Sequence, residues 1–182
     1  MSTTSLRPIE EFPQGFFYIK SRKNGMVLDV EGDSKNPNAR VIVWPQKFRA
    51  NDNQLWSYDD GYLTNKNSGL DTRISDRICI PTDQMTAKFL FDTQIIQSDR
   101  KLPQEVQYQR WYFCEEGFFY PLQNSHLVLD IKGDSDEKGT PVLLYQRKDT
   151  ENYNQLWTIE PYPFSSETFS LPGQEGYSYS YV

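Results

Sequence analysis

The sequence predicts an all-β protein in which three related units close into a barrel with pseudo-threefold symmetry. Three observations lead to this fold class. The stretch GFFYIKSRKNGMVLDVEGDS at 15–34 returns as GFFYPLQNSHLVLDIKGDS at 117–135, and each runs on to its own NQLW. Short runs rich in branched and aromatic residues recur, with no competing amphipathic helix. An acidic pair followed by glycine, in YDDGYL and CEEGFF, predicts a tight hairpin turn between successive units.

The spacing of the repeat shows that the units number three. Trp56 and Trp157 close the two obvious copies and lie 101 positions apart. That distance leaves room for a copy between them, which opens at Gly61 and closes at Trp111. From opening glycine to closing tryptophan the copies span 41, 50 and 40 positions, so the middle copy is enlarged by about nine residues.

We expect a single domain over residues 15–160, because 182 residues suffice for one sizeable core. The predicted copies, called copies one, two and three below, are 15–58, 59–114 and 115–160. Their strands include the runs MVLDV, RVIVW, LVLDI and PVLLY. Residues 1–14 form an N-terminal segment. Residues 161–182 contain three prolines and no periodicity, which predicts a tail or a strap across the barrel.

Composition excludes several classes of partner. A net charge of −6 and a pI near 4.9 would repel a phosphate backbone, so we expect no binding to nucleic acid. No window approaches 18 unbroken apolar residues, which argues against membrane insertion. The first residues lack the apolar core of a secretory signal, so we expect a cytoplasmic protein unless such a signal was trimmed. Cys79 and Cys114 are expected to be reduced, buried thiols.

A Q-x-W signature closes every copy, with the glutamine two residues before the tryptophan. We expect the three indoles to point inward and build a symmetric core. The amides of the glutamines are expected to bind backbone groups nearby, because a buried amide without partners is costly. The residues concerned are Gln54, Gln109, Gln155, Trp56, Trp111 and Trp157.

The three Q-x-W signatures, with LDV or LDI and NQLW framing the first and third, resemble those of the ricin B-type β-trefoil lectins over about residues 15–160. The resemblance implies a β-trefoil fold and carbohydrate binding. In that family a working site combines an aspartate from the LDV strand, an aromatic platform from the next strand, and an asparagine and a glutamine before the tryptophan. Two copies hold complete sets: Asp29, Trp44, Asn53 and Gln54 in copy one, and Asp130, Tyr145, Asn154 and Gln155 in copy three.

The chemistry of these residue types suits a sugar. A carboxylate presents two acceptor oxygens to vicinal hydroxyls, an aromatic face stacks on the C–H face of a pyranose, and asparagine can donate and accept. Galactose-type glycans are an implication of the resemblance. In a purely structural interpretation, the aspartates and asparagines cap turns. We favour a structural role for Gln54 and Gln155, and a binding role for the aspartates and the two rings.

Copy two retains the core residues but lacks the binding set. Alignment of Gly69 with Gly25 places Arg73 at the position of Asp29, with Asp71 two residues earlier, and Tyr108 replaces the asparagine. Its aromatic candidates, Phe89 and Phe91, lie beside an insertion of unassigned register. We expect no sugar site in this copy.

Other functional classes find less support. His126 with Cys79 or Cys114 matches no catalytic signature, and a lone histidine builds no zinc site, so we predict neither an enzyme nor a metal or cofactor site. The alternative is a protein-binding β-trefoil that uses residues 75–105 and the tail as its contact surface. Homodimerisation is left open.

Overall fold

The computed structural model describes residues 6–9, 11–75, 92–101, 109–122 and 124–163. Within this part of the chain the secondary structure consists of strands and short 3-10 turns. Copy one contains β1 (Phe17–Ser21), β2 (Val27–Val30), η1 (Glu31–Asp33), β3 (Val41–Trp44), η2 (Asp52–Gln54) and β4 (Trp56–Asp59). Copy two contains β5 (Tyr62–Asn65), β6 (Asp71–Ile74), β7 (Thr93–Ser98) and β8 (Trp111–Phe113). Copy three contains β9 (Phe119–Pro121), β10 (Leu127–Ile131), η4 (Lys132–Asp134), β11 (Val142–Gln146), η5 (Tyr153–Gln155) and β12 (Trp157–Pro161).

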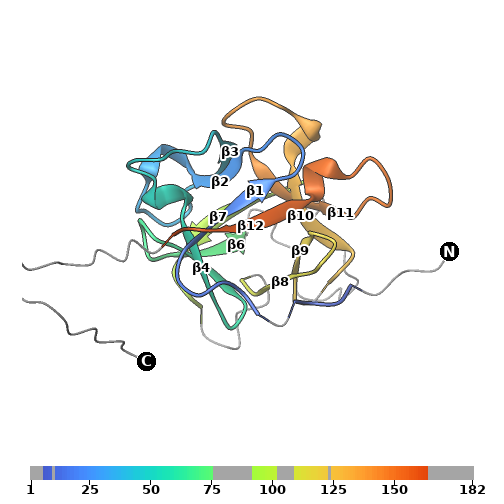
Figure 1. The fold of residues 1–182 in the computed structure, drawn as a ribbon, viewed down its shortest axis with the longest axis horizontal. Coiled ribbons are helices and arrows are strands. Elements are labelled where there is room, and N and C mark those ends of the chain that lie inside the picture. Colours follow the sequence, from blue (N-terminus) through green and yellow to red (C-terminus); the bar gives the residue numbers. More distant parts are fainter. Residues whose placement is uncertain (1–5, 10, 76–91, 102–108, 123, 164–182) are drawn as a thin grey trace, which may run out of the picture.

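The strands form a β-trefoil, as the repeat predicts. β1 pairs with β12 and β4, β4 pairs with β5, and β8 pairs with β9, so the outer strands of the three copies run beside one another. The inner strands form the hairpins β2–β3, β6–β7 and β10–β11, and β11 pairs with β7. Isolated bridges between Arg40 and Ile96 and between Ile42 and Pro141 link the first hairpin to the other two. In Figure 1 the loops of copies one and three project on opposite sides of the molecule.

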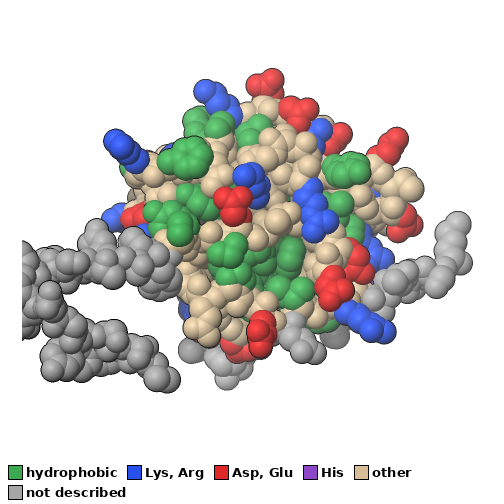
Figure 2. Space-filling view, in the orientation of Figure 1, with side chains coloured by type: hydrophobic (Ala, Val, Ile, Leu, Met, Phe, Trp, Pro, Cys, Tyr) green, Lys and Arg blue, Asp and Glu red, His purple; other side chains and the backbone are tan. Residues whose placement is uncertain are grey.

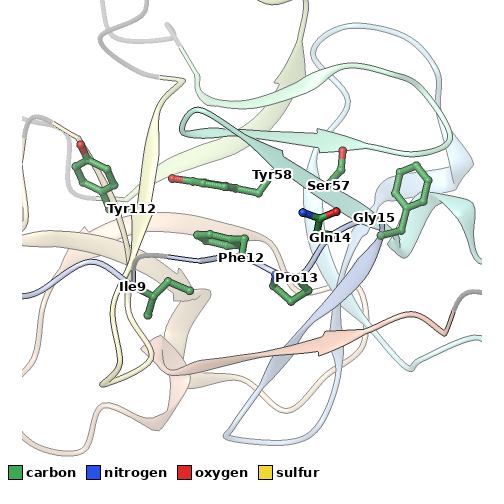
Figure 3. Close-up of a pocket in the computed structure, with 9 residues that line it drawn as sticks. Ile9, Phe12, Pro13, Gln14, Gly15, Ser57, Tyr58 and Tyr112 are labelled. Carbon is green, nitrogen blue, oxygen red and sulfur yellow. The ribbon is translucent and has the colours of Figure 1, made fainter. Parts of the chain in front are cut away.

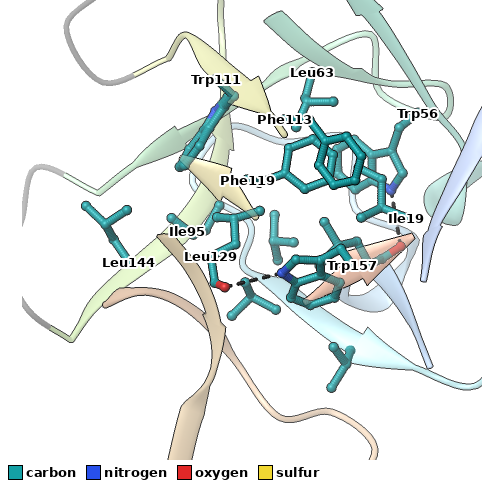
Figure 4. Packing of buried hydrophobic residues seen from close by; sticks show 14 of the residues in the cluster. Ile19, Trp56, Leu63, Ile95, Trp111, Phe113, Phe119, Leu129, Leu144 and Trp157 are labelled. Atoms are coloured by element: carbon teal, nitrogen blue, oxygen red, sulfur yellow. Dashed lines mark hydrogen bonds between the residues drawn. The ribbon is translucent and has the colours of Figure 1, made fainter. Parts of the chain in front are cut away.

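The three tryptophans occupy the core, as predicted. Trp56, Trp111 and Trp157 are at most 1% exposed. Each indole N–H donates to a carbonyl of its own copy's inner strand, at Leu28, Thr72 and Leu129 respectively; Figure 4 shows the bond from Trp157 to Leu129. These equivalent bonds give the copies a common register. They confirm that Asp29, Arg73 and Asp130 are structurally equivalent, since each directly follows its acceptor residue.

Strand pairing also locates the enlargement of copy two. Val30 pairs with Val41 and Ile131 with Val142, whereas Ile74 pairs with Ile95. The connection from β6 to β7 is therefore longer than its counterparts by about ten residues. The stretch 75–105 is the insertion that the alternative, protein-binding interpretation uses as a contact surface, but β7 within it is an inner strand of the fold. Residues 76–91 and 102–105 lie outside the described part of the chain.

The described residues of the N-terminal segment pack on the barrel. The Ile9 amide donates to the Phe113 carbonyl at 2.9 Å, and the Phe12 ring stacks on Tyr58 with centroids 3.6 Å apart. A hollow of about 560 Å³ lies along this segment, between it, β4 and β8 (Figure 3). The described residues that line it carry no charged side chain: Ile9, Phe12, Pro13, Gln14, Gly15, Phe16, Ser57, Tyr58 and Tyr112.

Cys114, directly after β8, is fully buried and has a free thiol. Burial raises the pKa of this thiol to about 11. Such a thiol is a poor nucleophile at neutral pH. His126 is exposed on the loop before β10. Cys79 falls outside the described residues.

On the face seen in Figure 2, acidic and basic side chains are interspersed.

Candidate functional site

The hairpin register places the predicted aspartate and aromatic ring of each set on one face. Asp29 on β2 lies opposite Ile42 on β3, and Trp44 follows two residues later. Because side chains alternate along a strand, Asp29 and Trp44 are diagonal neighbours on the face directed away from the core. Leu28 and Val30, on either side of Asp29, belong to the core cluster.

Copy three repeats this arrangement. Asp130 on β10 lies opposite Leu143 on β11, and Tyr145 follows two residues later on the same face. Leu129 and Ile131 point into the core. The alternation of buried apolar and polar positions therefore brings carboxylate and ring together twice.

Asparagine and glutamine hold the copy-one carboxylate from both sides. Asn53 Nδ2 donates to Asp29 Oδ1 and Gln54 Nε2 donates to Asp29 Oδ2, each at 2.9 Å. The other amide hydrogen of Asn53 bonds the Val30 carbonyl at 3.0 Å. Asp29 is 3% exposed, so these bonds replace most of its hydration.

The copy-three carboxylate is held by the equivalent pair, but unevenly. Asn154 Nδ2 and Gln155 Nε2 both donate to Asp130 Oδ2, at 3.0 and 2.8 Å. Among the described residues no hydrogen bond reaches Asp130 Oδ1. This oxygen retains its acceptor capacity for a hydroxyl.

Burial perturbs both carboxyl groups. Desolvation raises the pKa of Asp29 to about 6, against the opposing effects of the Gln54 bond and the Lys47 charge. Desolvation likewise raises the pKa of Asp130, opposed by Gln155 and Lys148. With a pKa near 6, Asp29 is mostly ionised at pH 7 and acts there as an acceptor.

A lysine beside each site was missed in the sequence. Lys47 Nζ lies 3.0 Å from Asn53 Oδ1, 3.0 Å from Asp33 Oδ1 and 3.9 Å from Asp29 Oδ2. Lys148 Nζ lies 3.0 Å from Asn154 Oδ1. The two lysines are 101 positions apart, so the spacing that revealed the aspartates would also have revealed them.

The turn that follows each aspartate aims a second carboxylate at the site. In η1 the backbone is left-handed at Gly32 (φ 66°) and Asp33 (φ 52°), and η4 repeats this at Gly133 (φ 64°) and Asp134 (φ 54°). Two consecutive left-handed residues favour glycine at the first, because a Cβ there is strained. This explains the recurrence of G-D-S in the sequence.

In copy three these residues line one hollow of about 550 Å³. Asp130, Tyr145 and Asn154, three of the four predicted residues, meet there, and Tyr145 is 38% exposed. The remaining lining residues are Asp92, Lys132, Gly133, Asp134, Leu143 and Lys148. In copy one the equivalent ring, Trp44, is partly buried.

The predicted glutamines act from beneath the sites. Gln54 and Gln155 are fully buried, and each Oε1 accepts from the backbone amide of the site lysine, at 2.8 and 2.9 Å. Each Nε2 also donates to a carbonyl, of Pro45 or Gln146. Their structural role is confirmed; they orient Asp29 and Asp130.

Copy two carries the scaffold without the binding set. Gln109 makes the same two backbone bonds, to Lys101 N at 2.8 Å and Asp99 O at 2.9 Å. Arg73 replaces the aspartate, and the register of β6 and β7 places Ser98 at the platform position. Tyr108, Phe89 and Phe91 lie outside the described residues.

The displaced carboxylate of copy two has another partner. Asp71, 2% exposed, accepts from Arg100 Nε at 2.9 Å and from Thr64 Oγ1 at 2.6 Å. Arg100 in turn lies over the Tyr62 ring. Asp71 is thus a buried carboxylate paired with a partly exposed arginine.

Comparison with known proteins agrees with this geometry. The model of the ricin-type β-trefoil lectin domain matches residues 15–157, most of the chain. The chain belongs to this lectin family. The lectin domain is 48% identical to mucoricin of Rhizopus delemar over 58 residues, which are 31% of this chain and 40% of mucoricin. It therefore spans less than half of that relative.

Two solved structures show the same fold. The C-half of an earthworm R-type lectin, solved in complex with GalNAc, is 26% identical with a TM-score of 0.63; the match covers 80% of this lectin and 97% of that chain. ThreeFoil, a designed protein with threefold symmetry, is 23% identical with a TM-score of 0.63 over 82% of this lectin and 100% of the design. The second likeness concerns the fold alone.

The described residues include no helix long and apolar enough to cross a membrane. Nor do they bring three His, Cys, Asp or Glu side chains together in a group able to hold a metal ion.

Proposed function

We propose that this lectin binds glycans of the galactose or N-acetylgalactosamine type at two shallow sites, one in copy one and one in copy three. The observation that carries the proposal is the hollow of copy three, where Asp130, Tyr145 and Asn154 meet. The equivalent residues of copy one share the same hairpin register, and the equivalent asparagine and glutamine donate to the carboxylate, there to separate oxygens. The earthworm relative solved with GalNAc supports the choice of sugar.

The carboxylate would fix the orientation of the sugar. Asp130 Oδ1 is free to accept from a hydroxyl, and charge-assisted bonds of this kind are stronger than neutral ones. The amide hydrogens of Asn154 are committed to Asp130 and the Ile131 carbonyl. Its Oδ1, shared with Lys148, is the amide group left to accept from the ligand. Lys148 can donate to a second hydroxyl.

The aromatic ring would supply the apolar contact. A pyranose presents C–H groups on one face, and stacking on Tyr145 or Trp44 removes that face from water. The polar groups on the other side then determine which hydroxyl configuration fits. No step in this recognition breaks a bond, and we propose binding without catalysis, in the cytoplasm.

Each site alone is expected to be weak. A shallow site of this kind corresponds to affinities from millimolar to micromolar, or about −4 to −8 kcal/mol. Two sites on one rigid body gain avidity on clustered glycans whose spacing matches them.

A glycan array with calorimetry tests the proposal. Methyl β-galactoside should bind the parent protein with a stoichiometry of two. Asp29→Asn and Asp130→Asn should each reduce it to one, because the charge is lost and an amide nitrogen, which cannot accept, replaces one carboxylate oxygen. The matched control, Asp99→Asn in copy two, should keep both sites. Absence of any bound glycan, or unchanged binding by both site variants, would refute the proposal.

A further inference from the structure

Each inner hairpin is bordered by a loop from another copy. The backbone amides of Gly139, Asp92 and Asn38 donate to the carbonyls of Val43, Leu144 and Gln97, at 2.8, 3.1 and 2.8 Å respectively. All three donors have left-handed backbones, with φ values of 84°, 73° and 67°. They are therefore equivalent positions. Each lies next to the residue that precedes a platform position: Trp44, Tyr145 or Ser98.

In copy one this border is cationic. Lys138, directly before Gly139, places its Nζ 5.2 Å from the centroid of the Trp44 ring. Gly139 itself has no side chain, and a Cβ there would touch Trp44 Cζ3 at 3.6 Å. The lysine from copy three thus lies against this platform, and its loop borders β3 on the edge opposite β2, which carries Asp29.

In copy three the same border is anionic. Asp92 stands at the position of Gly139 and lines the hollow together with Tyr145 and Asp130. Copy two thus contributes an exposed carboxylate to the border of copy three, one position after the equivalent of Lys138. The two platforms differ in the sign of the charge beside them.

Several charges on the aspartate side of each site are ion-paired. In copy one Glu31 is paired with Arg40, and Asp33 with Lys47. In copy three Lys132, Asp134 and Lys148 line the hollow, and Asp134 is paired with Lys23 of copy one, 3.1 Å away. At the borders that other copies form beside the two rings, Lys138 and Asp92 carry opposite charges.

We propose that the two sites divide glycans by charge. Copy one favours a sugar that carries a carboxylate or sulfate beside the stacked ring, with Lys138 as its specificity residue. Copy three favours an uncharged sugar, because Asp92 repels an anionic substituent. This inference rests on the proposed function, since it presupposes that both platforms stack a sugar.

The expected size of the effect follows from the exposure of the charges. An ion pair at the surface changes an affinity by about two- to fivefold at low salt. Attraction in copy one and repulsion in copy three act in opposite directions, so their effects multiply when the sites are compared. Screening should reduce the difference as salt rises.

The test uses single-site proteins and matched probes. Asp130→Asn isolates copy one and Asp29→Asn isolates copy three. Methyl β-galactoside, its 3-O-sulfate and its 6-O-sulfate are titrated into each by calorimetry. For at least one sulfate, the ratio of its affinity to that of the neutral sugar should be about four- to twenty-fivefold higher in copy one. Comparing ratios cancels the steric cost of the sulfate that both sites share.

Charge reversals then assign the effect to single residues. Lys138→Glu in the copy-one protein should lower its sulfate ratio, and Asp92→Lys in the copy-three protein should raise its ratio. The matched control is Lys35→Glu, which makes the same change of charge on the equivalent loop of copy one, at the border of copy two. It should leave the ratio unaltered.

The outcomes separate the two proposals. If the neutral galactoside binds neither single-site protein, both the proposed function and this inference fail. If it binds both, but the sulfate ratios are equal or do not respond to Lys138→Glu and Asp92→Lys, only the division by charge fails. A ratio that Lys35→Glu lowers as much as Lys138→Glu would attribute the effect to net charge and overturn the role of Lys138.

Discussion

Copies one and three differ from copy two on the outer face of the inner hairpin, while on the opposite face all three share a buried tryptophan. On the shared face each copy buries a tryptophan whose indole bonds a carbonyl of the inner strand. On the other face Asp29 and Asp130 are replaced by Arg73, and the aromatic platform by Ser98. Folding therefore constrains one side of the hairpin, and the other side is free to gain or lose a ligand.

Glutamine connects these two faces. In every copy it bonds a backbone amide and a carbonyl seven to ten residues earlier in the chain, so it belongs to the scaffold. In copies one and three its Nε2 also reaches the aspartate. A carboxylate placed one residue after the indole's acceptor thus finds a donor that the fold already supplies.

The largest effect should come from the shared face. Trp111→Ala in copy two should lower the free energy of unfolding by about 3–5 kcal/mol, as should Trp157→Ala in copy three, because each leaves a large cavity. Urea denaturation measures both. A loss below about 1 kcal/mol in copy two alone would show that the copies do not share one scaffold.

The next effect distinguishes the copies by pH. Because folding raises the pKa of Asp29 from 3.8 to about 6, the native state holds this proton more tightly than the unfolded chain. The contribution of Asp29 to stability is thus greatest below pH 4 and falls as pH rises to about 6, by about 3 kcal/mol for a shift of two units.

Unfolding of the parent and of Asp29→Asn from pH 4 to pH 7 checks this sign. The parent should lose stability relative to the variant across that window. Arg73, the equivalent residue of copy two, does not titrate there, so Arg73→Lys serves as the control and should follow the parent. Parallel curves for the parent and Asp29→Asn would contradict the burial of a charged carboxylate.

A smaller effect separates the two roles of the glutamine, which bonds the backbone in every copy and the aspartate in copies one and three. Gln109→Ala should cost about 2 kcal/mol, because a buried amide and a carbonyl lose their partners. Gln54→Ala should cost about 1 kcal/mol more, since Asp29 also loses a donor. Thermal and urea unfolding measure both; equal losses would mean that Gln54 does not hold Asp29.

The smallest effect concerns the site lysines. Lys47 is held by Asp33 and Asn53 at partly exposed positions, so Lys47→Ala should cost at most about 1 kcal/mol. Lys101 occupies the equivalent place in copy two, and Lys101→Ala is the control, with a loss near zero. A larger loss at Lys101 would show that the lysine serves the fold and not the site.

Sequence reasoning recovered the fold because its signals were repeated. The spacing of 101 positions and the alignment of Gly25 with Gly69 placed Asp29, Arg73 and Asp130 at one structural position, which the indole bonds confirm. The inward orientation of the tryptophans and the structural role of the glutamines are also confirmed. The function of the predicted binding residues stays a prediction.

Other features were not predicted from the sequence. The stretch 75–105 was interpreted as an insertion, although it contains β7, because TQIIQS lacks the aromatic residue that ends β3. Lys47 and Lys148 were overlooked, since a single lysine in a loop carries no signal without its spatial neighbours. The sequence also did not show that Asn53 uses both amide hydrogens within the protein, in bonds to Asp29 and to the Val30 carbonyl.

By itself the sequence determined the number of copies, the core residues and the two copies that carry a carboxylate and a ring. It could do so because equal residues at equal spacing report equal backbone environments. Only the tertiary structure decided what surrounds those groups: the burial that raises the pKa of Asp29, and the loops from other copies that bring Lys138 to Trp44 and Asp92 to Tyr145. These depend on contacts between distant segments, and no local pattern encodes them.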